Sequence, residues 1–273
     1  MARTKVLVTV STYPLPSSSY DELVCTAGFR EDGSWIRIYP VPFKFLSHRK
    51  YQWVELDLVR RDPSQDFRPE SYRPAQVDLS DLQALDIVDT NQNWHRRKEL
   101  CLQTVYTNMT ELIEDSKEPK NVSLAAFRPT SVQRFVIEDD AREWKASWLA
   151  QLQQLDLFTS GGQRQPGAQR IPIDKIPYRF KYHFTDDEGR SSTMTIEDWE
   201  VGALYRNCLR NAEGDEAQAL GKVREKYDTD FIQNKDITLF LGTTLIHHKK
   251  RHSNPFTIIG VFYPPRSAQS SLF

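Results

Sequence analysis

The expected fold rests on the segment Arg30-Glu31-Asp32-Gly33-Ser34-Trp35-Ile36-Arg37-Ile38-Tyr39, which joins a turn to an alternating strand. The Asp-Gly pair is a strong signal for a hairpin turn. Because neighbouring residues of a strand point to opposite faces, Trp35, Arg37 and Tyr39 share one face and both isoleucines share the other. The segment therefore predicts a hairpin with an apolar core face and a second face of aromatic and arginine side chains.

The rest of the first 160 residues predicts further strands and helices. Apolar residues spaced at about 3.6 positions predict a helix, or two short helices, from Trp94 to Ser116, and a helix from Asp140 to Phe158. Segments rich in β-branched and aromatic residues predict strands at Lys5 to Val10, Tyr20 to Phe29, Ser34 to Tyr39, Gln52 to Val59, Ser123 to Phe127 and Val132 to Ile137. We expect an N-terminal β domain with helices over residues 1–160.

The second part of the chain follows a Gly- and Gln-rich segment at 161–170, which we expect to be a flexible linker or loop. A second domain, residues 171–263, should hold a hairpin of Tyr178 to Thr185 with Ser191 to Thr195. A helix opened by an N-cap type residue at Thr195 and a helix from Gly214 to Tyr227 follow. Two paired strands, Asp236 to Leu245 and Phe256 to Tyr263, complete it, and residues 264–273 form an exposed C-terminal segment.

Composition limits the classes of function. The net charge of -1 provides no global attraction to nucleic acid, so binding would need local basic patches. Cys25, Cys101 and Cys208 show no metal-type spacing and fit reduced thiols in a cytoplasm. No window approaches the ~20 apolar residues of a membrane span, and the first residues do not resemble a signal peptide. We expect a soluble, cytoplasmic protein without a cofactor.

A basic and aromatic surface is the first candidate site. Flat rings that stack on bases, combined with arginines that contact phosphate, are how single strands are held on small barrels. An alternative is a cation-π layer that packs the loop against the sheet. The residues are Trp35, Arg37 and Tyr39 on the strand, with Arg60, Arg61, Arg68, Tyr72 and Arg73 in and beside the loop that follows.

A cationic segment lies between the last two predicted strands. Lys249, Lys250 and Arg251 could contact phosphates, and the flanking histidines would add charge when protonated. A solvated turn is the alternative interpretation. The local sequence supplies no carboxylate or thiolate to complete a metal site with these histidines, so no metal is predicted.

The C-terminal peptide, Gln269-Ser270-Ser271-Leu272-Phe273, follows a Pro264-Pro265 stop and a polar spacer. Two large apolar anchors behind a polar lead can fill a groove on a partner protein. The peptide resembles the Gln-x-x-Leu-Phe motif that binds the bacterial β sliding clamp, which would assign partner binding to Gln269, Leu272 and Phe273. Ser270 replaces the leucine common at that position. The alternative is that the apolar pair packs on this protein's own surface.

The sequence contains few motifs that are typical of enzymes. No nucleotide-binding glycine motif, metalloprotease motif or nucleophile elbow occurs. Asp62, Asp66 and Glu70 could hold a metal for a nuclease, although the intervening arginines and prolines favour surface ion pairs. A pocket containing Glu22, Cys25 and Arg37 is a second catalytic hypothesis. We leave enzymatic activity open, leaning against it.

Five stretches of the chain carry a family resemblance. Residues 20–28 and 33–42, residues 67–72, and residues 239–243 with 258–262 look like a poorly characterised prokaryotic family described as dual OB-containing. The resemblance implies two OB-like barrels and, by fold analogy alone, nucleic-acid binding. We therefore predict a β-rich α+β protein with two small OB-like antiparallel barrels or sheets and accessory helices.

The leading functional hypothesis combines these observations. A non-enzymatic accessory protein of bacterial DNA repair, replication or antiviral defence would bind single-stranded or clamp-loaded DNA and be tethered to the sliding clamp. Tethering raises local concentration, so weak DNA binding could suffice. The alternatives are a nuclease or nucleotide-processing enzyme of a conflict or repair system, and a protein adaptor that binds no nucleic acid.

Overall fold

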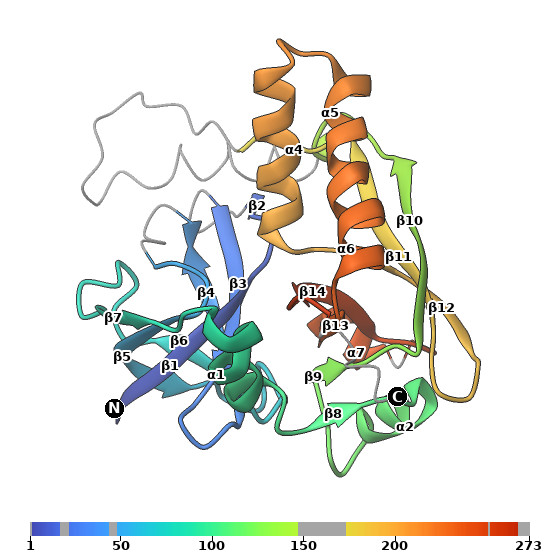
Figure 1. Ribbon diagram of the computed structural model, residues 1–273. Helices are drawn as coiled ribbons and strands as arrows, with labels where there is room; N and C mark the ends of the chain where they lie inside the picture. The colour runs from blue at the N-terminus through green and yellow to red at the C-terminus, as the bar shows by residue number, and fades with distance from the viewer. Residues whose placement is uncertain (1, 17–21, 44–47, 147–172, 251, 267–273) are drawn as a thin grey trace, which may run out of the picture.

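The computed structural model describes residues 2–16, 22–43, 48–146, 173–250 and 252–266. It confirms a β-rich α+β fold, in which a barrel formed by the first strands lies beside a second region of sheets and helices (Figure 1). Within the described residues, no helix has the length and apolar character needed to cross a membrane.

The N-terminal barrel is a closed ring of five strands in the order β1-β3-β4-β6-β5, which closes because β1 also pairs with β5. β4 and β6 are parallel, and the other neighbours in the ring are antiparallel. This ring is that of the OB-type Greek-key barrel. The strands are β1 Ala2–Ser11, β2 Leu15–Pro16, β3 Glu22–Phe29, β4 Trp35–Pro42, β5 Gln52–Arg60, β6 Ser71–Pro74 and β7 Gln83–Ile87.

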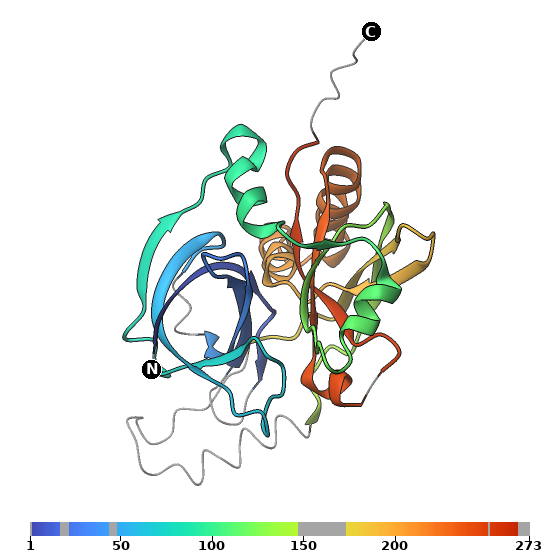
Figure 2. The same ribbon diagram turned by 90° about the horizontal axis from the view of Figure 1, so that it is seen from below.

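The barrel interior follows from alternation along the strands. Ile36 and Ile38 of β4 point inward with Val54 and Leu56 of β5, and all four are at most 3% exposed. The predicted hairpin is present, because Phe29 pairs with Trp35 across a turn in which Gly33 has a φ of 78°. Figure 2 looks into the ring from one end and shows the C-terminal region against one side of it.

The C-terminal region contains a three-stranded sheet, β10-β11-β12, and a four-stranded sheet, β14-β13-β9-β8. Short helices, a π-helical segment η2 and two longer helices connect the strands (Figure 1). The elements from residue 91 onward are α1 Asn91–Cys101, β8 Val105–Tyr106, α2 Met109–Asp115, β9 Leu124–Phe127, β10 Ser131–Asp139, β11 Tyr178–Thr185, β12 Ser191–Thr195, α4 Trp199–Asn211, α5 Glu216–Arg224, η2 Glu225–Asp230, α6 Phe231–Asn234, β13 Thr238–Thr243, α7 Leu245–Lys249 and β14 Phe256–Phe262.

The four-stranded sheet is buried on both faces, which explains its nearly continuous apolar strands. Along β13, Leu239 and Leu241 pack into the core of the C-terminal region, whereas Phe240 packs against the barrel. Along β9, Phe127 faces the first core and Ala126 the second. This sheet is therefore the layer on which the barrel rests.

Several local predictions are confirmed and others are corrected. The segment from Trp94 to Ser116 forms two short helices, and the hairpin of β11 and β12 and the pairing of β13 with β14 are present. The N-cap of α4 is Asp198 rather than Thr195, because Thr195 still pairs with β11 and the Asp198 carboxylate accepts from the Glu200 amide. The connection after β13 forms α7 instead of a plain turn. Most of the predicted helix at 140–158 and all of 161–170 lie outside the described residues.

Candidate functional site

The predicted aromatic and arginine face of β4 exists, but the C-terminal region covers most of it. The Trp35 ring lies 3.9 Å from that of Phe29 and 5.4 Å from that of Phe240, measured between centroids. Arg37 is 3% exposed, whereas Tyr39 remains 38% exposed. OB barrels commonly bind oligonucleotides on the face of their second and third strands, which here are β3 and β4. In this protein that face is used for packing within the chain.

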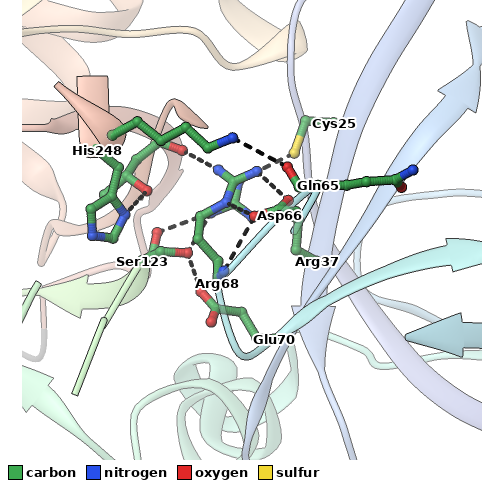
Figure 3. Close-up of polar contacts among 10 residues, drawn as sticks. Cys25, Arg37, Gln65, Asp66, Arg68, Glu70, Ser123 and His248 are labelled. Atoms are coloured by element: carbon green, nitrogen blue, oxygen red, sulfur yellow. Dashed lines mark hydrogen bonds and ion pairs between the residues drawn. The ribbon is translucent and has the colours of Figure 1, made fainter. Parts of the chain in front are cut away.

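Arg37 joins the barrel to the residue that precedes β9 (Figure 3). Its Nη2 donates to the carbonyl oxygen and to Oγ of Ser123, each at 3.0 Å, and its Nη1 lies 3.4 Å from Sγ of Cys25. The Ser123 hydroxyl donates in turn to Glu70. Because this guanidinium is buried and engaged, the expectation that Arg37 contacts phosphate is corrected to a structural role.

Arg68 is the second predicted phosphate contact that the structure places inside the protein. Its Nε and Nη2 donate to the two carboxylate oxygens of Asp66 at 2.8 and 2.7 Å, and its Nη1 donates to the Thr243 carbonyl at 2.8 Å. Burial by itself would raise the pKa of Asp66, but the hydrogen bonds from Arg68 hold this pKa below its usual value. Arg68 therefore connects the loop after β5 to the end of β13.

His248 is buried, although the sequence placed it in a cationic turn. Its Nδ1 lies 3.1 Å from Oγ1 of Thr243 and its Nε2 lies 2.6 Å from the Ser116 carbonyl oxygen. The ring also meets the Phe67 ring edge-on at 4.8 Å. Burial lowers the pKa of His248, so it does not add charge near neutral pH. We call the buried residues His248, Arg37, Asp66, Arg68 and Ser123, together with the half-buried Glu70, the buried polar cluster.

Cations that remain on the surface border the loop at 61–70. Arg61 donates its amide to the Ser71 carbonyl at 3.0 Å, and Lys249 reaches the Gln65 carbonyl at 3.5 Å, so segments distant in sequence meet at this loop. We define the basic rim as five cationic residues beside this loop: Arg60, Arg61, Arg73, Lys249 and Lys250. Among the described residues, no carboxylate lies within ion-pair distance of their side chains. Arg251 lies outside the described residues.

The aromatic partners expected beside this rim are only partly available. Tyr72 is half-buried, and the Arg30 guanidinium covers its ring at 4.9 Å from the centroid. Trp35 is half-buried against Phe240. The cation that covers Tyr72 is therefore Arg30, which lies outside the predicted set, and Tyr39 is the predicted ring that remains exposed.

The carboxylates proposed for catalysis do not come together. Asp62 is exposed and accepts from the Ser64 amide at 2.8 Å, while Asp66 and Glu70 belong to the buried polar cluster. Over the described ranges, no group of three or more His, Cys, Asp and Glu side chains could hold a metal ion. Glu22 accepts from the Ile173 amide at 2.6 Å, whereas Cys25 contacts Arg37.

Sequence reasoning missed a second polar contact between the barrel and the C-terminal region. Lys50 Nζ lies 3.1 Å from Asp198 Oδ2 and 2.7 Å from Glu200 Oε2, with the two acids at the start of α4. The N-cap pattern predicts acidic residues at the start of this helix. No local signal indicates that their partner is Lys50, which lies 148 residues before Asp198.

The residues assigned to clamp binding, Gln269, Leu272 and Phe273, lie outside the described residues. The chain just before them is attached to the C-terminal region through Arg266. Its amide donates to the Asn234 carbonyl at 3.0 Å, and its Nη2 donates to the Ile232 carbonyl at 2.8 Å.

Comparisons with known proteins identify the family. The chain belongs to the family of the domain of unknown function DUF8757, whose model matches residues 105–273. A second model, the domain of unknown function DUF8758, matches residues 2–103. No curated protein matches the chain.

Three solved structures resemble this chain at low identity. A crystal structure of the tetrameric p202 HIN2 is 8% identical with a TM-score of 0.30, covering 97% of this chain and 92% of that one. A murine DNA-binding protein bound with double-stranded DNA is 9% identical with a TM-score of 0.31, covering 98% and 97%. A replication protein A heterotrimer bound to single-stranded DNA is 9% identical with a TM-score of 0.25, covering 97% and 66%.

The family models and the strand pairing favour one division of the chain. The two models meet between residues 103 and 105. Strands β9 and β10 pair with β13 and β11, so a first domain ending at residue 160 would separate them from their partners. We propose a boundary near residue 104 in place of the one expected from the sequence.

Proposed function

We propose that this protein is a non-enzymatic, nucleic-acid-associated accessory protein that binds DNA through its basic rim. The observation that carries the proposal is that the rim borders the loop at 61–70, between β5 and β6 of the barrel ring: Arg61 lies in this loop, and Lys249 contacts its Gln65 carbonyl. OB barrels use the corresponding loop in binding oligonucleotides. The β4 face is packed against the C-terminal region, and within the part of the chain that the structure describes the cations of the basic rim have no carboxylate partner.

The charges of the rim fit a polyanionic partner. Arg60, Arg73, Lys249 and Lys250 are exposed and Arg61 is half-buried. Cations without carboxylate partners release counterions from a phosphate backbone when they bind it, which provides affinity without sequence preference. The exposed ring of Tyr39 near Arg61 offers a stacking surface for an unpaired base.

A second element of the proposal is tethering to the bacterial sliding clamp through Gln269, Leu272 and Phe273. Its support is the match of these residues to the Gln-x-x-Leu-Phe pattern. A tether raises the effective concentration of a weak DNA-binding surface near DNA. A role in DNA repair, replication or antiviral defence would follow from such a placement.

DNA binding is tested by fluorescence anisotropy with a labelled single strand of about 20 nucleotides and a matching duplex over a salt series. Reversing Arg60, Arg61 and Arg73 to Glu should weaken single-strand binding at least about tenfold and reduce the salt slope by roughly 2. The matched control reverses three exposed cations elsewhere, Arg134, Arg210 and Lys222. Equal affinity and slope for the rim variant and the wild type would refute the rim as the DNA-binding surface.

Clamp tethering is tested separately with purified β clamp. Deleting Gln269 to Phe273 should abolish clamp binding in a pulldown while leaving DNA affinity unchanged, because the basic rim stays intact. A matched variant with Ser270→Leu should bind the clamp more tightly, since leucine is common at that position of the motif. Clamp binding that survives the deletion would exclude this peptide as the tether.

A further inference from the structure

A cavity of about 570 Å³ lies between the barrel and the helices of the C-terminal region. Its size is in the range of small-molecule sites. The barrel side provides strand β1 and the residues before β5, and the other side provides the start of α4, the π-helical segment η2 and α6. It is separate from the basic rim and from the buried polar cluster, whose residues do not line it.

One wall of the cavity carries the ion pairs between Lys50 and the acids of α4. The Lys50 side chain is 16% exposed and Asp198 is 2% exposed, so their charges are largely paired with each other. Glu200 retains 37% of its side-chain surface. Its carboxylate can therefore accept a hydrogen bond from a ligand while one oxygen stays on Lys50.

Aromatic rings form the apolar part of the lining. The Phe43 ring meets the Trp199 ring at 4.9 Å, and the Phe231 ring stacks on the Tyr263 ring at 4.1 Å. Tyr227 adds a fifth ring. Phe231 and Tyr227 are at most 2% exposed, so the rings open to a flat ligand are the half-buried ones of Phe43, Trp199 and Tyr263.

Two exposed cations and one unusual histidine complete the lining. Lys226 lies in η2, and short π-helical segments often occur at functional sites. Arg49 lies on the barrel side. Both ring nitrogens of His48 are buried without a hydrogen-bond partner among the described residues, which is costly unless something else satisfies them.

We propose that this cavity binds one unstacked nucleobase together with its phosphate. The base would stack on the aromatic rings, Glu200 would accept hydrogen bonds from its N–H groups, and Lys226 and Arg49 would contact the phosphate. The choice of ligand rests on the proposed nucleic-acid function. The lining supplies aromatic rings and a carboxylate that can recognise a base, and two cations that can recognise a phosphate. A free nucleotide and one nucleotide of a single strand present the same chemistry.

The test uses isothermal titration calorimetry of the full-length chain with GMP, AMP, CMP and UMP, and with a short single-stranded oligonucleotide. Lys226→Ala should raise Kd about tenfold, because a charge-assisted hydrogen bond is lost. Its control is Lys222→Ala, an exposed lysine that pairs with Glu225 and does not line the cavity.

A second variant leaves the polar groups unchanged. Ala203→Phe would fill the cavity from α4 and should abolish binding, whereas Ala217→Phe on the exposed face of α5 should not. Binding of a mononucleotide that both cavity variants weaken supports a free-nucleotide ligand. Binding of the oligonucleotide alone, weakened by the same two variants, supports a nucleotide within a strand.

The remaining outcomes separate this inference from the proposed function. Oligonucleotide binding that depends on the basic rim but not on Ala203 or Lys226, without mononucleotide binding, overturns the cavity site and leaves the proposed function standing. Mononucleotide binding at the cavity without any DNA binding supports the cavity site and overturns the proposed function. No binding of either ligand overturns both.

Discussion

Arg68→Met probes whether the buried polar cluster holds the barrel to the C-terminal region. Methionine keeps the unbranched stem of arginine without its charged guanidinium. The substitution removes two hydrogen bonds to Asp66 and one to the Thr243 carbonyl, and leaves the Asp66 carboxylate buried without its partner. The side chains of Arg68 and Asp66 are 5% and 4% exposed, so solvent would do little to screen the uncompensated charge of Asp66.

The expected cost follows from this burial. Removing one partner of a buried ion pair typically costs about 3–5 kcal/mol, because the remaining charge is left uncompensated. For a chain of this size that corresponds to a decrease in Tm on the order of 10 °C. Adding Asp66→Asn to Arg68→Met should recover part of the loss, since it removes the isolated charge.

Thermal and urea unfolding followed by circular dichroism measure this difference. The matched control is Arg142→Met, which removes a two-pronged bond to Glu216 of similar geometry, at 2.7 and 2.9 Å, on the surface. Because solvent screens an exposed pair, the control should leave the unfolding midpoint unchanged. A loss for Arg68→Met no larger than for Arg142→Met would refute the assigned role of the cluster.

Three further predictions concern titration and backbone packing. Burial lowers the pKa of His48 to about 4, below the ordinary value of about 6.5, so protons bind the unfolded chain more readily and stability should fall as pH drops through this window. The urea unfolding midpoints at neutral and acidic pH should differ less for His48→Leu than for the wild type. An equal difference in both proteins would contradict the lowered pKa of His48. Gly28→Ala should destabilise by more than about 2 kcal/mol, because the new Cβ would lie 2.0 Å from the Leu7 carbonyl oxygen; a neutral effect in thermal unfolding would contradict the strand pairing. Gly221→Ala on α5 meets nothing within 4 Å and should stabilise by about 0.5–1 kcal/mol, and a loss of stability would argue against a helix there.

The packing of the OB-type barrel has a consequence for ligand binding. Trp35 and Arg37 occupy the face that such barrels commonly present to oligonucleotides, and here they contact Phe240 and Ser123 of the C-terminal region. A nucleic acid would therefore meet loops and the junction between the two regions. The basic rim and the cavity lined by Lys50 and Glu200 are both at this junction.

Local patterns were sufficient for most of the longer strands and for the faces of β4, but not for β6, β7 and α7. The short strand β6 lies in a proline-containing segment and is held by pairing with β4 and β5, which no local pattern indicates. The alternation from Trp35 to Tyr39 places both isoleucines inside the barrel, as predicted, because side-chain direction in a strand depends only on neighbouring positions. The Asp-Gly turn and the hairpin of β11 with β12 follow in the same way from short-range turn chemistry. The strands of β13 and β14 were recognisable as apolar runs.

The roles of the charged side chains depended on the tertiary structure. Arg37 and Arg68 read as phosphate contacts in the sequence, but their partners Ser123 and Thr243 are 86 and 175 residues away. The same holds for Lys50 and Asp198 across 148 residues. Whether a cation is solvated or buried is set by which surfaces pack together, and burial is stable only where distant groups supply the compensating charge or hydrogen bond. The sequence alone determined most of the strands and the sign of each charge, whereas the packing of the two regions decided which charges remain exposed to a ligand.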